Sequence, residues 1–559
     1  MKGWLKLITC LMMAAAIFTV TFTTSASDKD KPANPAKTKA VTFNKDVAPI
    51  LHNKCAECHR PGEAARFSVL SYKDVRPWAR SIKEKVVTRE MPPWHADPHV
   101  GRWANDRRLT EDQIRTIAAW VDQGAKEGEP ADATAAPSFA GGWSIGKPDV
   151  ILEMPEEYTL EATGPDEYQY FDVPTNFTED KYVQMAEARP GNRAVVHHII
   201  AFIVPPGEPN LSKMPKEMRD KAVEMSLKNT PFYRDGFLIR TKPDQPVYDD
   251  AKDVPQKLRG FNQVDDFLTA YAPGSNYGVW KPGTAKRIPA GAIIRLQVHY
   301  SKVAGSAQKD RSVIGLVFTK EPPADLMRTR AVMNMFFQIP PGADNHKVTA
   351  HWTPRTDVTL FVLMPHMHYR GKAMEFSVTY PDGRAERLLN VPNYSFAWQT
   401  AYKPDQPLRL PAGSTITVTG YFDNSAKNKF NPDPTKSVRH GEPTYDEMMM
   451  GFVDYIVEKP TKTLKLDPKV YDAYVGRYDL GNNRIYVVTR DGDRYFGQAT
   501  SNPKRELFAL SESKFLNPEV ESMLTFVKND KGEVVEMLFE RGEGGARYKR
   551  MKEEAAEKK

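Results

Sequence analysis

The chain is poor in cysteine and in long apolar runs. Only three of its 559 residues are cysteines, and one of them, Cys10, lies in an N-terminal stretch with the pattern of a secretory signal. Lys2 and Lys6 form the basic start of that stretch, and a short apolar run follows. The remainder keeps Cys55 and Cys58 alone, so no disulfide framework supports it. No later run is long and apolar enough to predict a membrane-spanning helix.

The N-terminal stretch predicts export. Small residues near Ala26 offer a cleavage site, which gives a signal peptide over residues 1–26 and a periplasmic or secreted bacterial protein. No membrane span is expected after cleavage. An uncleaved anchor is the alternative, but the apolar run is short for a span and lacks a stop-transfer flank.

Strong charge of one sign is also missing. The formal net charge is +7 over the whole chain, without clustered basic runs, so nucleic acid is not expected as a partner. The length exceeds what a single core supports and predicts several domains. The 44 prolines favour loops and strands over long helices.

The two remaining cysteines stand in a motif. Cys55, Cys58 and His59 form Cys-x-x-Cys-His, the pattern of covalent c-type haem attachment. Each thiol adds to one vinyl group, and the histidine that follows reaches the iron. A redox disulfide is the alternative, but the βαβ context of thioredoxin-like motifs is absent. One haem c per chain is therefore expected.

Helical patterns surround the motif. Apolar spacing before it predicts a helix, and residues 109–124 read as an amphipathic helix with a capping box at Thr110 and Gln113. Met91 is the preferred sixth haem ligand, with His95 and His99 as rivals; a His/Met pair suits electron transfer. Residues 41–126 resemble a small class I cytochrome c domain, and the small-residue, proline-rich residues 127–142 read as a linker.

Short alternating runs follow from about residue 143 to 458, which predicts β-sandwiches. Histidines recur there in an uneven pattern. His197 and His198 are adjacent, and adjacent residues on a regular strand face opposite sides. His299 lies on the polar face of its predicted strand. His366 and His368 are two residues apart, so one strand face presents both.

Four segments in this order resemble the copper type II ascorbate-dependent monooxygenases, the family of peptidylglycine α-hydroxylating and dopamine β-monooxygenases. The segments are His-His, Gln-Val-His-Tyr, His-x-His and Asp-Glu-Met, and the resemblance runs from about Pro165 to Val457. It implies two jelly-roll domains, residues 143–312 and 313–458, each with one copper. It also implies that one copper transfers electrons and that O₂ binds at the other. The implied ligands are, for the first copper, His197, His198 and His299, and, for the second, His366, His368 and Met448.

Ligand chemistry agrees with this assignment, because a thioether is soft and favours Cu(I). Met449 is a rival that would face the opposite side of its strand. Where the peptidylglycine enzyme grips a peptide carboxylate, this chain has Met364, Met450 and Phe452. The pocket is therefore expected to be apolar and to take a neutral or aromatic molecule.

The last region, residues 465–552, has alternating runs and hairpin turns without histidine or cysteine, and predicts a small β-rich structural or interaction domain. The expected fold class is multi-domain: a small α-helical cytochrome c domain, two jelly-roll β-sandwich copper domains and a small β-rich C-terminal domain.

The predicted function is hydroxylation of a C–H bond of a small organic substrate by O₂, with an external donor supplying electrons through the haem. A non-enzymatic haem and copper electron-transfer or copper-binding protein is the alternative. A sugar-binding sandwich with coincidental histidines is a third.

Overall fold

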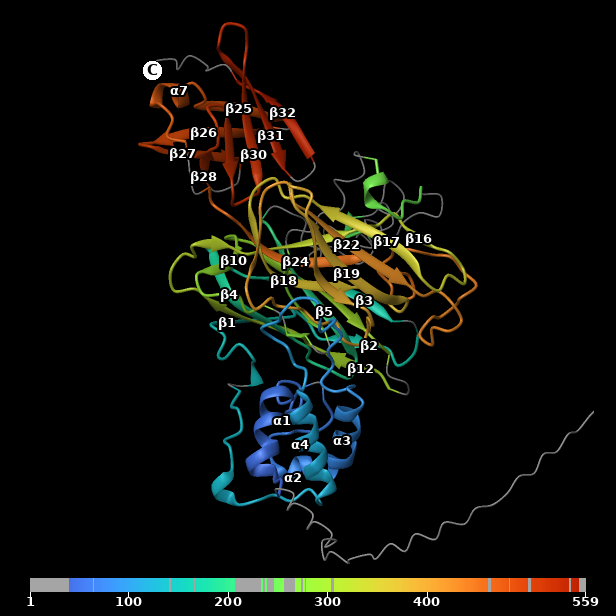
Figure 1. Cartoon of the computed structure of the whole chain (residues 1–559). Coiled ribbons are helices and arrows are strands. Elements are labelled where there is room, and N and C mark those ends of the chain that lie inside the picture. The colour runs from blue at the N-terminus through green and yellow to red at the C-terminus, as the bar shows by residue number, and fades with distance from the viewer. Residues whose placement is uncertain are drawn as a thin grey trace, which may run out of the picture.

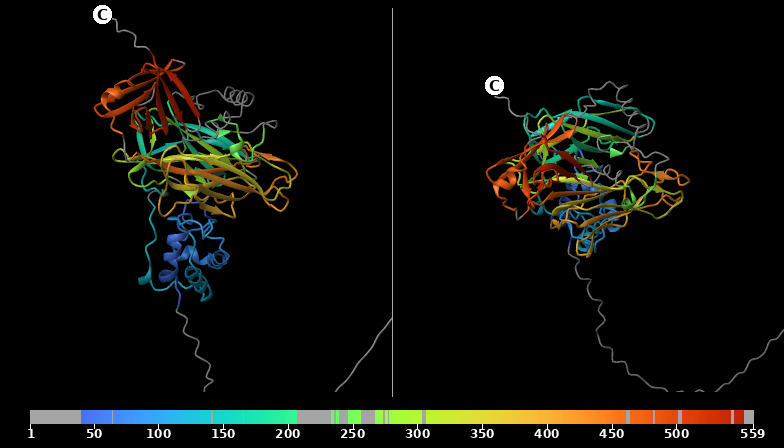
Figure 2. Two further views of the ribbon diagram at one scale, coloured as in Figure 1. Left: turned by 45° about the horizontal axis from the view of Figure 1, so that its top comes forward. Right: turned by 90° about the horizontal axis from the view of Figure 1, so that it is seen from above.

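The computed structural model describes residues 40–551 except 64, 140–141, 165, 207–232, 235–236, 239–245, 256–266, 273–274, 277, 303–305, 461–463, 482, 501–503 and 542–543. The expected signal peptide, residues 1–26, lies outside the described residues. Figures 1 and 2 place a small helical region and a C-terminal barrel at opposite ends of a central block of β-sheets.

The helical region packs around one small apolar core that includes Val47, Leu51, Ile117 and Trp120. Its helices are α1 (Ala48–Lys54), α2 (Tyr72–Val75), α3 (Ala79–Val87) and α4 (Glu111–Asp122), with short helical turns at Phe43–Val47, Arg76–Trp78 and Pro130–Asp132.

Helix α4 begins and ends where the sequence predicts. Thr110 Oγ1 accepts the Gln113 N–H at 3.2 Å, and Gln113 Oε1 accepts the Thr110 N–H at 2.9 Å, which completes the capping box. Gly124 follows the helix with a φ of +93°, a left-handed conformation that glycine adopts without strain. Leu109 and Ile114 pack in the same core. The predicted helix is confirmed.

The first sheet pair consists of two facing five-stranded sheets with strand orders β1-β13-β4-β10-β14 and β3-β11-β5-β8-β9. One core, which includes Val183 and Leu316 from the former and Ile199 and Leu296 from the latter, fills the space between them. The strands are β1 (Val150–Glu153), β3 (Glu167–Pro174), β4 (Lys181–Arg189), β5 (Val196–Val204), β8 (Phe267–Ala272), β9 (Ser275–Asn276), β10 (Thr284–Ile288), β11 (Ile293–Tyr300), β13 (Val313–Phe318) and β14 (Asp325–Leu326), with two small ribbons, β2 (Tyr158–Leu160) with β12 (Gln308–Asp310) and β6 (Tyr233–Arg234) with β7 (Phe237–Leu238).

The second sheet pair has orders β15-β24-β18-β21 and β17-β22-β19-β20. Its strands are β15 (Arg328–Met333), β17 (His346–Trp352), β18 (Val358–His366), β19 (Gly371–Thr379), β20 (Ala385–Val391), β21 (Leu408–Leu410), β22 (Thr415–Phe422) and β24 (Met450–Val457), with a ribbon of β16 (Gln338–Ile339) and β23 (Val438–Arg439). Alternate residues of β24 face different neighbours, because successive strand residues point to opposite sides. Val453 and Tyr455 enter the core of this pair, whereas Met450 and Phe452 enter an apolar layer shared with β5 and β8 of the first pair.

The C-terminal region is an eight-stranded antiparallel sheet in sequence order, preceded by α7 (Pro468–Asp472). A bridge between Tyr478 and Arg550 brings its first strand beside its last, so the sheet is a nearly closed barrel. The strands are β25 (Gly476–Gly481), β26 (Arg484–Asp491), β27 (Arg494–Ala499), β28 (Arg505–Ala509), β29 (Lys514–Asn517), β30 (Ser522–Lys528), β31 (Val534–Arg541) and β32 (Gly544–Lys549).

The fold class expected from the sequence is wrong. Strands make up 41% of the chain and helices 12%, and the described residues contain no sizeable α-helical cytochrome domain. The longest described helix of the N-terminal region, α4, has only 12 residues. Periodicity identifies helical turns but says nothing of how many loops separate them, and short helices depend on tertiary packing. The last region is a nearly closed barrel, a closure that the strand pattern alone does not specify.

The helical region is docked on the second sheet pair. Ala96 and Trp103, from the loop between α3 and α4, are buried in the core of that pair. The Trp103 ring lies edge-on to Tyr402 at 5.3 Å. Backbone bonds secure the loop, from Asp97 N–H to the Asn390 carbonyl at 2.8 Å among others. This region of the chain therefore holds a defined position against the β-sheets.

A buried lysine joins the two sheet pairs. Lys286 of β10 donates to the carbonyls of Phe267 and Leu268 at 2.7 and 3.1 Å, and to Thr329 Oγ1 of the second pair at 2.6 Å. Thr329 in turn donates to Asp454, which also accepts from the Trp280 indole N–H at 3.1 Å. Burial lowers the pKa of Lys286 to about 8, although Asp454 opposes the shift.

This depressed pKa predicts a pH-dependent stability. Between pH 8 and the ordinary lysine pKa the unfolded chain binds a proton that the folded chain does not, so folding becomes more favourable as the pH rises. The free energy of unfolding of the wild type relative to Lys286→Met should therefore increase across this window, by up to about 3 kcal/mol. Denaturant titrations of both proteins at about pH 7.5, 9 and 10.5 measure this difference in the free energy of unfolding. A difference that is constant or falls with pH contradicts the assignment.

Candidate functional site

The first histidine set comes from two paired strands of the first sheet pair. His198 of β5 pairs with His299 of β11, and Tyr300 pairs with Val196. His197 is therefore an extra residue in the ladder, a β-bulge that changes the direction of its side chain. The bulge lets His197 and His198 face the same site, which a regular strand would not allow.

The three imidazoles converge. His198 Nδ1 lies 3.2 Å from His197 Nδ1 and 3.4 Å from His299 Nδ1, and one ligand atom from each residue lies within 4.8 Å of the others. Burial lowers the pKa of His197 to about 4 and that of His198 well below its ordinary value. The neutral imidazole is the metal-binding form. This set could hold a metal ion.

Two further residues orient His299. Its Nε2 lies 3.1 Å from Asp166 Oδ2. The Tyr168 ring stacks on the His299 imidazole, with the ring centroids 4.3 Å apart and an interplanar angle of 6°. A carboxylate on the far nitrogen is the usual support for a metal-binding imidazole, because it sets the tautomer and the ring orientation. Neither residue was predicted as a site residue from the sequence: Tyr168 of β3 pairs with His299, and Asp166 directly precedes that strand.

The second set lies on the second sheet pair. His366 ends β18, His368 follows it, and Met367 between them points into the opposite core. The two imidazole centroids are 5.3 Å apart. His366 Nδ1 bonds Gln399 Oε1 at 2.7 Å and His368 Nδ1 bonds the Asp446 carbonyl at 3.2 Å, so each ring keeps its Nε2 for another partner. Burial lowers the pKa of both.

Met448 is the predicted sulfur ligand of this set. Its side chain lines the same cavity as both histidines, whereas Met449 is buried in the core of the second sheet pair. Period-two alternation separates the two methionines in the way that the sequence predicts. Met364 and Met450 line the cavity as well, so the choice of Met448 as the sulfur ligand stays a prediction.

Glu447 holds the second set in place. Its buried carboxylate accepts backbone N–H groups from His368 at 2.9 Å, Arg370 at 2.6 Å and Met448 at 3.3 Å. Burial raises the pKa of Glu447 to about 8, against the opposing effect of these donors and of Arg370. The segments that carry His368 and Met448 are far apart in sequence, and this one side chain ties them together. From the sequence, Glu447 was recognised only as part of the Asp-Glu-Met segment, without a role of its own.

Both histidine sets meet at one cavity of about 40 Å³. His198 lines it from the first sheet pair, and His366, His368 and Met448 line it from the second. Phe396 lies between the sets, stacked on His197 at 4.8 Å and edge-on to His368 at 6.0 Å. Much of the remaining lining is apolar and includes the three positions expected from the sequence, Met364, Met450 and Phe452.

The Cys-x-x-Cys-His motif lies on the loop after α1. Cys55 and Cys58 are free thiols, and burial raises the pKa of both. His59 Nδ1 lies 3.2 Å from the Phe67 carbonyl oxygen, which orients the ring and leaves Nε2 as the ligand atom. Met91 is half-buried in the turn after α3, where its N–H donates to the Lys85 carbonyl. Its choice as sixth ligand over His95 and His99 stays a prediction.

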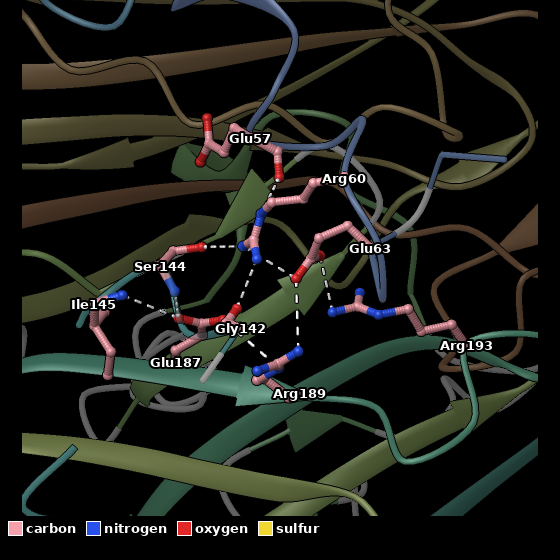
Figure 3. Close-up of polar contacts among 9 residues, drawn as sticks. All are labelled: Glu57, Arg60, Glu63, Gly142, Ser144, Ile145, Glu187, Arg189 and Arg193. Atoms are coloured by element: carbon pink, nitrogen blue, oxygen red, sulfur yellow. Dashed lines mark hydrogen bonds and ion pairs between the residues drawn. The ribbon is translucent and has the colours of Figure 1, made fainter. Parts of the chain in front are cut away.

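An ion-pair network anchors this loop on the first sheet pair (Figure 3). The buried Arg60 donates to the Gly142 carbonyl at 2.8 Å and to Ser144 Oγ at 3.1 Å, and pairs with Glu63 at 3.2 Å. Glu63 is also nearly buried, so its charge requires the nearby cations.

Glu63 extends the network to the end of β4 and to the turn that leads into β5. It pairs with Arg193 at 2.9 Å and Arg189 at 3.7 Å (Figure 3). Arg193 lies shortly before His197 in the chain, and its guanidinium covers the Tyr271 ring at 5.1 Å. Tyr271 lines the histidine cavity. A continuous set of contacts therefore connects the cysteine loop with the cavity.

No helix among the described residues is long and apolar enough to cross a membrane. No family model matches the chain, and no curated protein matches it.

Solved structures that match are distant. SurE with D-Leu matches at 18% identity and a TM-score of 0.14, over 26% of this chain and 32% of that one. PNGF-II matches at 11% identity and a TM-score of 0.25, over 54% of this chain and 65% of that one. The major capsid protein P2 from Bacteriophage PM2 matches at 10% identity and a TM-score of 0.19, over 55% of this chain and 99% of that one. The chain thus spans about a third of the length of SurE and 65% of the length of PNGF-II. TM-scores this low carry no functional argument.

The position of Glu447 predicts a loss of local order on Glu447→Gln. An amide has one acceptor oxygen, so at least one of the three N–H groups would face an NH₂ group instead. The free energy of unfolding should fall by about 1–3 kcal/mol, and amide exchange at His368 and Met448 should accelerate. Denaturation and hydrogen exchange measure this. The control is Glu512→Gln on the surface, and equal effects of both variants contradict the role.

Proposed function

We propose that this chain is an exported copper-dependent monooxygenase that hydroxylates a C–H bond of a small organic substrate with O₂. Conversion of R–H and O₂ to R–OH and water takes two electrons and two protons. An external donor would supply the electrons through a c-type haem at Cys55 and Cys58. The observation that carries the proposal is one cavity lined by His198, His366, His368 and Met448, with the ligand atoms of His197 and His299 within 4.8 Å of that of His198.

The side chains fit copper. Three imidazoles suit either copper redox state, and two imidazoles with a thioether favour Cu(I). Bound copper would supply one-electron chemistry and O₂ activation. Burial lowers the pKa of four of the imidazoles, those of His197, His198, His366 and His368. Asp166, Gln399 and the Asp446 carbonyl orient the rings of His299, His366 and His368. These contacts hold both sets before any metal binds.

The motif at the helical region fits a haem. Cys55 and Cys58 are unbridged, and among the described residues His59 Nε2 makes no hydrogen bond. A haem attached there would supply a one-electron carrier. The network through Glu63 and Arg193 holds the attachment loop against the strand of His197. This arrangement suits electron delivery to the first histidine set.

The cavity beside the second set is small and mostly apolar. Its volume of about 40 Å³ admits water-sized molecules but is far below the roughly 300 Å³ of a usual small-molecule site. An organic substrate therefore requires lining side chains to move. Met364 and Met450 are suited to this, because methionine is unbranched and adopts many rotamers at low cost.

Glu442 supplies a carboxylate to the same cavity. Its Oε1 accepts from Gln297 Nε2 at 2.5 Å and from the Tyr170 hydroxyl. The overall reaction consumes two protons, and a buried carboxylate with a phenol partner can hold and deliver a proton. We assign Glu442 this task.

The alternative function is electron transfer or copper binding without turnover. Such a protein needs the ligands but has no use for a closed apolar cavity beside a thioether ligand. The cavity favours the enzyme, and turnover of O₂ separates the two.

The sulfur of Met448 predicts a specific loss of turnover. Met448→His should retain copper, because imidazole is also a good ligand, but it favours Cu(II) and hinders access to the reduced state. Substrate-dependent O₂ uptake should fall roughly 10–100-fold. Oxygen-electrode assays of the copper-loaded chain with ascorbate and a panel of small aromatic compounds, together with product analysis, measure it.

Met449→Leu is the matched control, since Met449 packs in the core. It should keep most of the turnover. Loss of activity in Met449→Leu alone would show that Met449 is the ligand. Wild-type chain that binds copper without hydroxylating any compound, or without copper-dependent O₂ uptake, supports the electron-transfer alternative.

The haem motif predicts covalent attachment. Haem should stay with the protein through acid–acetone extraction, because thioether bonds resist it. Cys58→Ser should leave a single thioether and shift the reduced pyridine haemochrome band, which absorption spectroscopy detects. Free haem recovered from the wild type would overturn this assignment. An unchanged spectrum in Met91→Ala would favour His95 or His99 as the sixth ligand.

A further inference from the structure

A second cavity, of about 310 Å³, lies where the cysteine loop meets the second sheet pair. Its walls are polar. Lys54, Glu57, Asp106 and Arg107 line it from the helical region, and Lys403 lines it from the opposite side. The volume is at the lower end of the range for small-molecule sites.

The walls of this cavity are held firmly together. The Ala104 N–H donates to the Lys403 carbonyl at 2.8 Å, and the Lys403 N–H donates to Asn105 Oδ1 at 3.0 Å. Asn105 Nδ2 in turn donates to the Ala401 carbonyl at 2.7 Å. The cavity is therefore a built part of the docking surface.

Both carboxylates in this cavity are already neutralised. Asp106 accepts two hydrogen bonds from Arg108 Nε, at 3.1 and 2.9 Å, and one from the Arg108 N–H at 2.8 Å. Glu57 pairs with Arg107 at 2.7 Å. The charge that remains in the cavity is that of the two lysines.

The ammonium groups of Lys54 and Lys403 can each donate further hydrogen bonds. Lys54 Nζ gives one hydrogen bond, to the Asp106 carbonyl at 2.7 Å, and an ammonium has three donors. The half-buried Lys403 ammonium has no hydrogen-bond or ion-pair partner among the described residues. Burial lowers the pKa of Lys403, against the opposing effect of the Asp454 and Glu57 carboxylates, neither of which is in ion-pair contact with it.

We propose that this cavity binds the carboxylate of a small organic anion, with Lys54 and Lys403 as its charge partners. Charge-assisted bonds from both ammonium groups to one carboxylate satisfy donors that the chain itself leaves open. Asn105 adds a fixed polar wall.

Two sources of that carboxylate fit the position. Lys54 and Glu57 of the cysteine loop line the cavity, so a haem bound at Cys55 and Cys58 would lie nearby, and its propionate is one candidate. A free organic acid from solution has the same chemistry. The first source rests on the proposed haem, whereas the second does not.

Succinate is the probe. Isothermal titration at low ionic strength, with the full chain in haem-free and haem-loaded forms, should show one saturable site in at least the haem-free form. Dimethyl succinate, which lacks the charge, should not bind. Lys403→Met should weaken succinate binding by roughly tenfold, Lys403→Arg should retain it, and the exposed Lys429→Met should bind like the wild type.

The outcomes separate the sources. Binding to both forms identifies a free organic acid. Binding to the haem-free form alone, with a shift of the haem midpoint potential in Lys403→Met but not in Lys429→Met, identifies a propionate. Absence of saturable succinate binding in either form, or equal binding of dimethyl succinate, overturns the proposal whether or not the chain carries haem. If Lys403→Met does not fold, the comparison of succinate with its ester in the wild type still decides.

Discussion

The cavity shared by the histidine sets depends on the relative position of the two sheet pairs, and the buried ammonium of Lys286 is a polar group that connects them. It binds two carbonyls of its own pair and Thr329 of the other. Burial of such a charge is costly, so it persists only where its partners are correctly placed. Any displacement of the pairs would break these bonds and separate His198 from His366.

Desolvation sets the chemistry at the cavity. Histidines at the surface would be partly protonated near neutral pH, but the same burial that forms the apolar layer around Met450 and Phe452 keeps these imidazoles neutral. Oriented acceptors then decide which nitrogen faces the cavity. The two sets differ in this respect. The first presents Nδ1 atoms to one another, whereas Nδ1 of His366 and His368 is occupied and Nε2 remains.

The helical region is attached by two different interactions. Apolar side chains of its loop, Ala96 and Trp103, enter the core of the second pair, and ion pairs centred on Glu63 join it to the first. It thus contacts both pairs and supports their arrangement. The lysine-rich cavity lies at the same junction, which is where a bound anion would add a further contact.

The sequence by itself determined features that depend on local periodicity. The capping box at Thr110 predicted where α4 begins, because the cap involves residues three apart. The alternation of strand residues separated Met448 from Met449, and the resemblance to the copper monooxygenases predicted that Met364, Met450 and Phe452 line an apolar pocket. These patterns fix which side of an element a residue occupies.

Only the tertiary structure decided what depends on pairing between distant segments. The bulge at His197 arises from its register against β11, so the common direction of His197 and His198 was not visible in their spacing. Glu447 and Gln399 became positioning groups because distant segments bring backbone N–H groups and an imidazole to them. The expected α-helical cytochrome domain was wrong and the barrel closure was missed for one reason. Periodicity is a property of single elements, whereas the size and closure of a domain depend on how elements pack.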